Sequence, residues 1–423
     1  MREFKDSGIE WLGEIPKEWG LVRGAFIFSN KKILNSTLQC QERLSLTMEG
    51  VIERNIDDNN GLNPLDFRTY QIFQQDDLVF KLIDLDNIKT SRVGYVHKIG
   101  IMSSAYIRLI PAKNIFSKYF YYQYFDMYLK HIFNYLGTGV RSTLNCDELL
   151  NIKVVYPPLK EQEQIAEFLD KKCEKISNFI DKKQKLITLL EEKKQALINE
   201  AVTKGLDKRA ELKDSGIKYL GKIPKHWEVR KLKFVISTNI GLVYVPEEIV
   251  NNKNEGYPVL RANNIQNGKI NYQDLIYVNS KQIREKQVAL IGDLLMCVRN
   301  GSDNLLGKTA KIMDNDLSFG AFTAIIRSRF NDYLYWIFQT DLLKKSITNF
   351  SMAIGIGQIS QDDIKNFTVP FPPLQEQKEI AQFLDSKIAK IDTIIEKTKK
   401  QIELIKEYKT TLISQAICGR INL

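Results

Sequence analysis

Few residues in this chain have the types and spacing that enzyme active sites use. The carboxylates Asp77 and Asp293 could in principle hold Mg²⁺, but no neighbouring acid and lysine complete a nuclease-like set in either half. We expect Asp293 to be a turn residue at the end of a loop. Five cysteines stand far apart without a CxxC pair, and the three histidines are equally scattered. This spacing argues against a disulfide framework, a structural zinc site and a histidine-based triad.

Nucleotide and cofactor motifs are missing as well. The chain contains no GxxxxGK[ST] loop, which excludes ATP hydrolysis through a P-loop. Gly355-Ile356-Gly357 is a lone Gly-x-Gly without the strand and helix of a dinucleotide site. The stretch Asn63-Pro64-Leu65-Asp66 lacks the second proline and the aromatic residue of an amino-methyltransferase tetrapeptide. We therefore expect no catalytic centre, no metal site and no cofactor bound by this chain.

The charge of the chain is unevenly distributed. Its formal net charge of +10 suits a polyanionic partner without identifying one. Residues 157–208 carry +1 and residues 372–420 carry +2, which leaves +7 for the rest of the chain. A generic basic protein is the alternative interpretation. Because no apolar run approaches bilayer-spanning length and the N-terminus lacks a signal-peptide core, we expect a cytoplasmic protein without a membrane partner.

Two blocks of sequence occur twice, in the same order. Residues 4–19 recur at 212–227 with 11 identities in 16 positions, and residues 157–170 recur at 372–385 with 10 identities in 14. We call the first pair of blocks the tryptophan segments. The repetition indicates a duplicated chain. Each half runs from a tryptophan segment through a variable stretch to a Pro-Pro pair and a long helix.

The stretch after each Pro-Pro pair has the pattern of a coiled-coil helix. Apolar residues alternate at spacings of four and three, in the same register in both copies at an offset of 215 residues. The polar interruptions match too, Lys183 with Thr398 and Lys194 with Lys409. The alternative is a pair of merely solvated helices with an apolar stripe. The residues predicted to pair the helices are Ile176, Ile180, Ile187, Leu190, Leu197, Ile391, Ile395, Ile402, Ile405 and Leu412.

The variable stretches look β-rich with some helix. Short apolar runs after Asp77 and Asp293 occupy equivalent positions, and aromatic residues at helical spacing follow each of them further along. We interpret the aromatic stripes, 116–135 and 330–348, as domain core rather than as base-stacking platforms. The predicted fold class is α+β, with two homologous α/β domains separated by two long coiled-coil helices in a pseudo-twofold repeat. The predicted segments are 1–156 (domain 1), 157–208 (first helix), 209–371 (domain 2) and 372–423 (second helix).

Over essentially its full length the chain resembles the specificity subunits of Type I restriction-modification systems. The resemblance is carried by the duplicated SGIxxLGxIPxxW segments at Ser7–Trp19 and Ser215–Trp227 and by the duplicated PPLxEQxxIAxFLD segments at Pro157–Asp170 and Pro372–Asp385. In the second half, the string Arg261–Ile265, the Gly292–Leu295 turn and the loop from Asn300 to Lys308 are also typical.

The resemblance implies that each α/β domain is a target-recognition domain (TRD1 and TRD2) that contacts one half of a split, asymmetric sequence in double-stranded DNA. The helices would pair antiparallel and fix the length of an uncontacted spacer, so one added helical turn should lengthen that spacer. Two methyltransferase (M) subunits and two ATP-driven restriction (R) subunits would join the chain. S-adenosylmethionine, ATP and Mg²⁺ would then be bound by these partner subunits.

For the DNA contacts we consider the side-chain types that address base edges and phosphates. Within this set Arg299 is the strongest candidate for a bidentate guanine contact and Lys308 for a phosphate contact. The two domains differ at equivalent places, which predicts that they recognise different bases. The candidates in TRD2 are Arg261, Asn263, Asn264, Arg299, Asn300, Ser302, Lys308 and Ser318. The candidates in TRD1 are Thr47, Arg68, Lys81, Ser91, Arg92, Ser104 and Tyr106.

Three alternatives remain open from the sequence. The chain could be a DNA-binding nuclease component whose catalytic site carries no recognised motif. It could be a coiled-coil scaffold that binds only proteins. The tryptophan segments could dock a methyltransferase subunit, but we favour a structural role in which they fasten each domain to a helix end.

Overall fold

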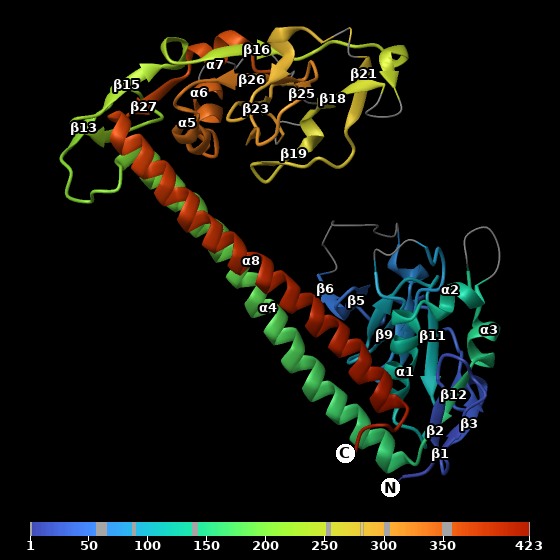
Figure 1. Cartoon of the computed structure of the whole chain (residues 1–423). Coiled ribbons are helices and arrows are strands. Elements are labelled where there is room, and N and C mark those ends of the chain that lie inside the picture. Colours follow the sequence, from blue (N-terminus) through green and yellow to red (C-terminus); the bar gives the residue numbers. More distant parts are fainter. Residues whose placement is uncertain are drawn as a thin grey trace. The chain divides into compact units, whose positions relative to one another are not determined.

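The computed structural model describes residues 2–55, 66–86, 90–137, 143–250, 255–279, 281, 283–299, 305–348 and 358–422. The chain forms two compact units (Figure 1). The first unit contains residues Met1–Gln184 and Lys399–Leu423, and the second contains Lys185–Thr398. Each unit therefore consists of one globular lobe and the adjoining parts of both long helices.

The lobe of the first unit, TRD1, is built on two four-stranded sheets. In both sheets neighbouring strands are antiparallel, except that β5 and β10 are parallel. The first sheet has the order β4 (Phe28–Ser29), β11 (Ile107–Pro111), β8 (Leu78–Phe80), β9 (Val93–Tyr95). The second has the order β6 (Gly50–Arg54), β5 (Arg43–Thr47), β10 (Gly100–Met102), β7 (Gln71–Phe73). Two strand pairs and three helices complete TRD1: β1 (Phe4–Asp6) with β2 (Glu14–Pro16), β3 (Gly20–Arg23) with β12 (Lys153–Tyr156), α1 (Ser117–Leu129), α2 (Ile132–Leu136) and α3 (Cys146–Asn151).

The lobe of the second unit, TRD2, repeats this strand order. Its parallel pair is β18 with β25, at the place of β5 with β10. The first sheet has the order β16 (Ser237–Ile240), β26 (Thr323–Arg327), β23 (Leu294–Cys297), β24 (Thr309–Lys311). The second has the order β17 (Ile249–Val250), β21 (Ile276–Asn279), β18 (Gly256–Leu260), β25 (Leu317–Phe319), β22 (Val288–Ala289). The remaining elements are β13 (Leu212–Asp214) with β14 (Lys222–Pro224), β15 (Glu228–Lys231) with β27 (Thr368–Phe371), the hairpin β19 (Ile265–Gln266) with β20 (Lys269–Ile270), α5 (Asn331–Phe338), α6 (Leu342–Thr348) and α7 (Gln361–Asn366).

The shared strand order confirms the predicted fold class of two homologous α/β domains. The predicted role of the aromatic stripes is also confirmed within the described residues, since Tyr119, Phe120 and Tyr124 of α1 and Tyr333 of α5 are buried. These side chains lie between the first sheet of each lobe and the adjoining long helix. Core packing therefore accounts for the aromatic spacing that the sequence shows.

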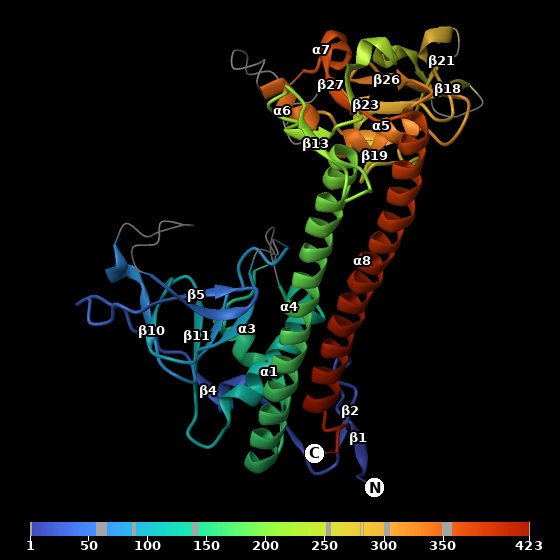
Figure 2. The ribbon, with the colours of Figure 1, turned by 90° about the vertical axis from the view of Figure 1, so that its left-hand side faces the viewer.

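The two predicted long helices are α4 (Leu159–Lys204) and α8 (Leu374–Ile417). Within each unit they lie side by side (Figure 1 and Figure 2). They are antiparallel, because α4 begins in the first unit, where α8 ends, and ends in the second unit, where α8 begins. None of the described helices is apolar enough along its length to cross a membrane.

The predicted seam residues lie on the inner faces of these helices. Ile176, Ile187, Ile391, Ile395, Ile402 and Leu412 are buried, and Ile180, Leu190, Leu197 and Ile405 are half-buried. In the second unit the seam residue Lys194 forms an ion pair with Asp392 of the other helix at 2.6 Å. The polar interruption is therefore satisfied across the helix pair, which confirms the coiled-coil prediction.

Each tryptophan segment joins the start of one long helix to the end of the other. The indole of Trp19 is buried and its Nε1 donates to Glu161 in the first turn of α4. The same ring packs on Gly419, just beyond α8, where a Cβ would lie 2.8 Å from the ring. Gly419 has a φ of +67°, a left-handed conformation that favours glycine after a helix end. One buried ring thus fixes two helix termini in the first unit.

The second unit contains the same arrangement. Trp227 is fully buried and its Nε1 donates to Glu376 of α8 at 2.9 Å. Its ring contacts Gly205, which follows α4 with a φ of +77°. Next to these glutamates in the sequence, Gln162 and Gln377 each donate to the carbonyl of the first proline of the Pro-Pro pair. The repeated EQ dipeptide therefore fastens the tryptophan segment and the Pro-Pro corner to the helix.

Two further contacts attach each lobe to the helix pair. Buried Tyr119 donates to the carbonyl of Ile417 near the end of α8, and buried Tyr333 donates to that of Val202 near the end of α4. The aspartate that closes each FLD triplet accepts from an aromatic side chain of its lobe: Asp170 from Tyr122 and Asp385 from Trp336. These geometries favour the structural interpretation of the tryptophan segments.

We predict that Trp227→Ala lowers the free energy of unfolding by about 3–5 kcal/mol, since it empties a fully buried ring site between two helix ends. Trp227→Phe should cost less, because it keeps the ring and loses only the hydrogen bond to Glu376. Phe234→Ala is the matched control: its ring is 73% exposed, so the change should stay within about 0.5 kcal/mol. Denaturant unfolding measures all three, and equal losses for Trp227→Ala and Phe234→Ala would contradict this account.

Candidate nucleic-acid interface

The strand order of TRD2 gathers several loops at one end of its first sheet. Because neighbouring strands are antiparallel, the ends of β16 and β23 lie beside the beginnings of β26 and β24. Arg299 follows β23, and Lys308 immediately precedes β24. Arg261, which follows β18 of the second sheet, faces the same loops. The topology thus brings together three candidate residues that are up to 47 positions apart in the sequence.

The segments that follow β16 and β18, together with the one that leads into β26, enclose a hollow of about 510 Å³, which we call the TRD2 hollow. Next to the lining residue Leu242, Gly241 allows a close backbone approach: a Cβ there would lie 2.3 Å from the carbonyl oxygens of Phe319 and Gly320. Val243 and Phe322 are exposed apolar side chains of the lining. The residues that line the hollow are Leu242, Val243, Tyr244, Arg261, Ala262, Asn263, Gly320, Ala321, Phe322 and Thr323.

A short turn presents the Arg261 string at the hollow. The buried side chain of Asn264 accepts from the backbone N–H of Arg261 and donates to the carbonyls of Asn271 and Gln273. Asn264 therefore shapes the turn, whereas Asn263 beside it is exposed. The guanidinium of Arg261 donates to the carbonyl of Asp274 at 2.9 Å, and its buried Nε has no partner in the described part of the chain.

The remaining TRD2 candidates fall into three groups. Arg299 and Lys308 are exposed, and the Arg299 guanidinium lies over the ring of Phe322, 5.5 Å from its centroid. Ser318 is fully buried within β25. Asn300 and Ser302 lie outside the described residues. Arg261, Asn263, Arg299 and Lys308 are thus the TRD2 candidates available to a ligand at this end of the lobe.

The TRD1 candidates gather at the equivalent end of their lobe. Lys81 follows β8, and Ser104 and Tyr106 precede β11. Thr47 stands at the end of β5, where its hydroxyl donates to the carbonyl of Gly50 in the hairpin turn. Arg68 is exposed on the short turn before β7, within 3.5 Å of Asp66. Tyr106 is half-buried, and burial raises the pKa of its hydroxyl.

Four predicted contact residues have internal roles instead. In TRD1, Arg92 is 2% exposed and donates to the carbonyls of Ile83 and Asp84, and its burial lowers the pKa of the guanidinium. The buried hydroxyl of Ser91 donates to the carbonyl of Val93. Together with Asn264 and Ser318 in TRD2, these side chains would reach DNA only if the strands or turns around them separated. We therefore leave these four out of the proposed contact set.

Sequence reasoning overlooked several exposed residues at the same ends. Lys31 and Lys32 follow β4 in TRD1, and Lys32 Nζ donates to the carbonyl of Ser104, one of the predicted residues. In TRD2 the overlooked residues are Val243 and Phe322, which line the hollow. A double lysine and an exposed phenylalanine are visible in the sequence. Only the strand order shows that these residues lie near the candidate contact residues.

The two carboxylates considered for Mg²⁺ binding both form ion pairs with arginines. Asp77 forms a buried ion pair with Arg108, and buried Asp293 forms an ion pair at 2.6 Å with the partly exposed Arg327. Each aspartate also accepts a backbone N–H three residues earlier, which confirms the turn role expected for Asp293. Burial raises the pKa of Asp77 despite the Arg108 hydrogen bond, whereas the hydrogen bond from Arg327 to Asp293 raises the pKa of that arginine. Among the described residues no three His, Cys, Asp or Glu side chains group as a metal site requires.

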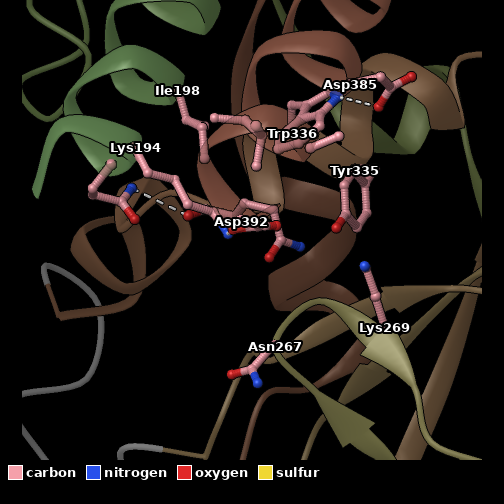
Figure 3. Close-up of a pocket in the computed structure, with 12 residues that line it drawn as sticks. Lys194, Ile198, Asn267, Lys269, Tyr335, Trp336, Asp385 and Asp392 are labelled. Carbon is pink, nitrogen blue, oxygen red and sulfur yellow. Dashed lines mark hydrogen bonds and ion pairs between the residues drawn. The ribbon is translucent and has the colours of Figure 1, made fainter. Parts of the chain in front are cut away.

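A second hollow of the second unit lies where TRD2 meets the helix pair (Figure 3). Its walls include the Lys194–Asp392 ion pair and the Trp336–Asp385 hydrogen bond. Tyr335 closes another side by donating to the carbonyl of Gly268, in the hairpin that carries Asn267 and Lys269. The volume of about 220 Å³ lies below the range of small-molecule sites. These contacts make this hollow a junction between lobe and helices.

Comparison with known proteins agrees with the repeated architecture. A family model described as "Type I restriction modification DNA specificity domain" matches residues 27–192 and 224–404. The EcoKI specificity subunit of Escherichia coli is 29% identical over 207 residues, which are 48% of this chain and 45% of that protein. The MjaVIII specificity subunit of Methanocaldococcus jannaschii is 25% identical over 342 residues, 78% of this chain and 76% of that protein. The matched region thus spans about half the length of the Escherichia coli relative.

Two solved structures share the fold. A chain in a structure concerned with complex assembly and conformational transition of a Type I R-M system aligns with a TM-score of 0.73 at 14% identity, covering 96% of this chain and 99% of that one. The HsdS subunit from Thermoanaerobacter tengcongensis aligns with a TM-score of 0.53 at 15% identity, covering 96% and 98%. At these identities the likeness concerns the fold alone.

We predict that Asp77→Asn destabilises the chain by about 3–5 kcal/mol, because it leaves the buried Arg108 guanidinium without its counter-charge. Glu3→Gln, which breaks the exposed Lys17–Glu3 pair, should cost at most about 1 kcal/mol. Mg²⁺ should not raise the melting temperature of the unmodified chain. A Mg²⁺-dependent rise that disappears in Asp77→Asn would show that this carboxylate is a metal ligand.

Proposed function

Because the chain belongs to the family of Type I restriction modification DNA specificity domains, we propose that it is the DNA-recognition subunit of a Type I restriction-modification complex. The observation that carries the proposal is the repetition of one lobe fold with different side chains at the same end of its first sheet. A repeated scaffold with diverged contact loops suits a protein that recognises two different half-sites.

The two lobes offer different chemistry for DNA. TRD1 presents mainly ammonium groups at this end, from Lys31, Lys32 and Lys81, which act as point charges toward phosphates. TRD2 presents guanidinium groups from Arg261 and Arg299 beside apolar surfaces. Arginine can donate two hydrogen bonds to one guanine edge. We therefore propose an asymmetric, bipartite target, with the antiparallel helices setting the length of its spacer.

We further propose that catalysis belongs to partner subunits. Asp77 and Asp293, the two carboxylates considered for Mg²⁺, each form an ion pair with an arginine of the same lobe. S-adenosylmethionine would be bound by two methyltransferase subunits, and ATP and Mg²⁺ by two restriction subunits. This chain would supply the position on DNA at which they act.

Surface residues of the long helices support the docking of two equivalent partners. Phe179 of α4 and Ile394 of α8 are 39% and 45% exposed and occupy equivalent positions at the repeat offset. Leu189 and Leu404 form a second equivalent pair, 61% and 54% exposed. Each unit carries one member of each pair. Exposed apolar side chains repeated in this way suit one methyltransferase subunit per unit.

The proposed function is tested by mapping methylated adenines in a host genome with and without the gene for this chain. We expect one two-part motif with a constant spacer that appears only when the gene is present. Methylation that is unchanged by the gene would refute the proposal. The purified chain should also leave DNA intact in the presence of Mg²⁺, since reproducible cutting would favour the nuclease alternative.

The docking proposal predicts the stoichiometry of the complex. Leu189→Glu or Leu404→Glu should each remove one methyltransferase subunit, and the double variant should remove both, because a buried unpaired carboxylate opposes association. Tyr408→Glu is the control: Tyr408 is 50% exposed, but its equivalent position holds Lys193. Native mass spectrometry counts the subunits. Two bound subunits in the double variant would contradict the assignment.

A further inference from the structure

The contact between Arg299 and Phe322 is built by the backbone at the TRD2 hollow. Arg299 follows β23 and Phe322 immediately precedes β26, the neighbouring strand (Figure 1). The backbone N–H groups of Val298 and Arg299 both donate to the carbonyl of Phe322, at 3.0 and 3.3 Å. These backbone hydrogen bonds place the two residues side by side, independently of the contact between their side chains. The guanidinium carbon then lies 5.5 Å from the ring centroid.

Core packing does not explain the position of the Phe322 ring. The residue is 57% exposed, whereas the residues of the preceding strand β25, such as Phe319, are buried. A ring in this place adds little buried area, but it offers its face to a cation. The guanidinium carbon of Arg299 lies over the ring and the side chain is exposed, so its N–H edge remains available to a ligand. Two parallel N–H bonds from that edge match O6 and N7 of guanine.

TRD1 has no such pair at the equivalent positions. Ile107 lies opposite Phe80 and Ala324 opposite Met296, so the strand registers of the two lobes can be matched. In this register Ala105 takes the place of Phe322, and Ile83 takes the place of Arg299. Among the described residues, the arginine–phenylalanine contact at this place is therefore present in TRD2 and not in TRD1. Whatever base it selects should belong to one half of the target.

We propose that Phe322 is a positioning residue that holds Arg299 edge-on for guanine, so that TRD2 selects a guanine at one position of its half-site. This inference rests on the proposed function, because it assigns a base preference to a DNA-recognition lobe. Phe322 acts through Arg299: its ring restricts the rotamers of the guanidinium, which lowers the conformational cost of forming both hydrogen bonds.

The test uses the full chain assembled with its methyltransferase subunits and a DNA library randomised over both half-sites. Arg299→Ala should reduce guanine preference at one position by about 5- to 150-fold. Phe322→Ala should reduce it at the same position by about two- to six-fold, the size of an exposed cation–π contact. Phe322→Tyr keeps the ring and should restore the preference. Ile83→Ala in TRD1 is the matched control and should leave that position unchanged.

The outcomes separate this inference from the proposed function. A complex of the unmodified chain that selects no motif would refute the proposed function itself. A complex that selects a motif, but whose Phe322→Ala variant keeps full guanine preference, would refute the positioning role alone. Loss spread evenly over all positions of both half-sites would also overturn it, since that pattern indicates damaged folding or lost phosphate contacts. Melting temperatures of the variants would reveal damaged folding. We expect them to match that of the unmodified chain, because both side chains are exposed.

Discussion

The structure depends on how each lobe holds the ends of two long helices. A helix end leaves backbone groups without partners, and each of these helices of more than forty residues has its two ends in different units. In each unit a buried tryptophan stabilises two helix ends at once. Its indole N–H binds a glutamate in the first turn of one helix, while its ring packs on the glycine that terminates the other. Because one ring serves both helices, their relative register at that place is fixed by a single side chain.

This constraint separates the part of each lobe that must stay the same from the part that can change. The residues that attach each lobe to the helices (the tryptophans, the EQ dipeptides, the FLD aspartates and the buried tyrosines of α1 and α5) occur in both units with partners at equivalent positions. The described loops at the end of the first sheet make no such contacts, and the two lobes carry different side chains there. The proposed cationic contacts of TRD1 are mostly lysines (Lys31, Lys32 and Lys81), whereas TRD2 combines the arginines Arg261 and Arg299 with apolar surface. Divergence of these loops can therefore alter base preference without disturbing the helix pair.

The sequence predicted the parts of the fold that follow from local periodicity and repetition. The seam residues were recognisable because a spacing of four and three continues along both copies in the same register, which is typical of a coiled coil. The aromatic stripes were recognisable as core for a similar reason. Burial of individual polar side chains was not predictable, because it depends on partners brought from elsewhere: Arg92 is held by the carbonyls of Ile83 and Asp84, and Asn264 by a turn that closes several residues later. Phe322 was missed because its proposed positioning role requires contact with Arg299, which is 23 residues away in the sequence. The pairing of β23 with β26 brings the two residues together.

We propose that the paired helices set the spacing between the two half-sites. Inserting one heptad into each helix, after the equivalent residues Lys185 and Lys400, keeps the seam in register and lengthens each helix by about 10 Å. Methylation mapping with this variant should give the same two half-sites separated by about three additional base pairs, at 3.4 Å per base pair. An unchanged spacer, together with retained methylation of both half-sites, would contradict the claim.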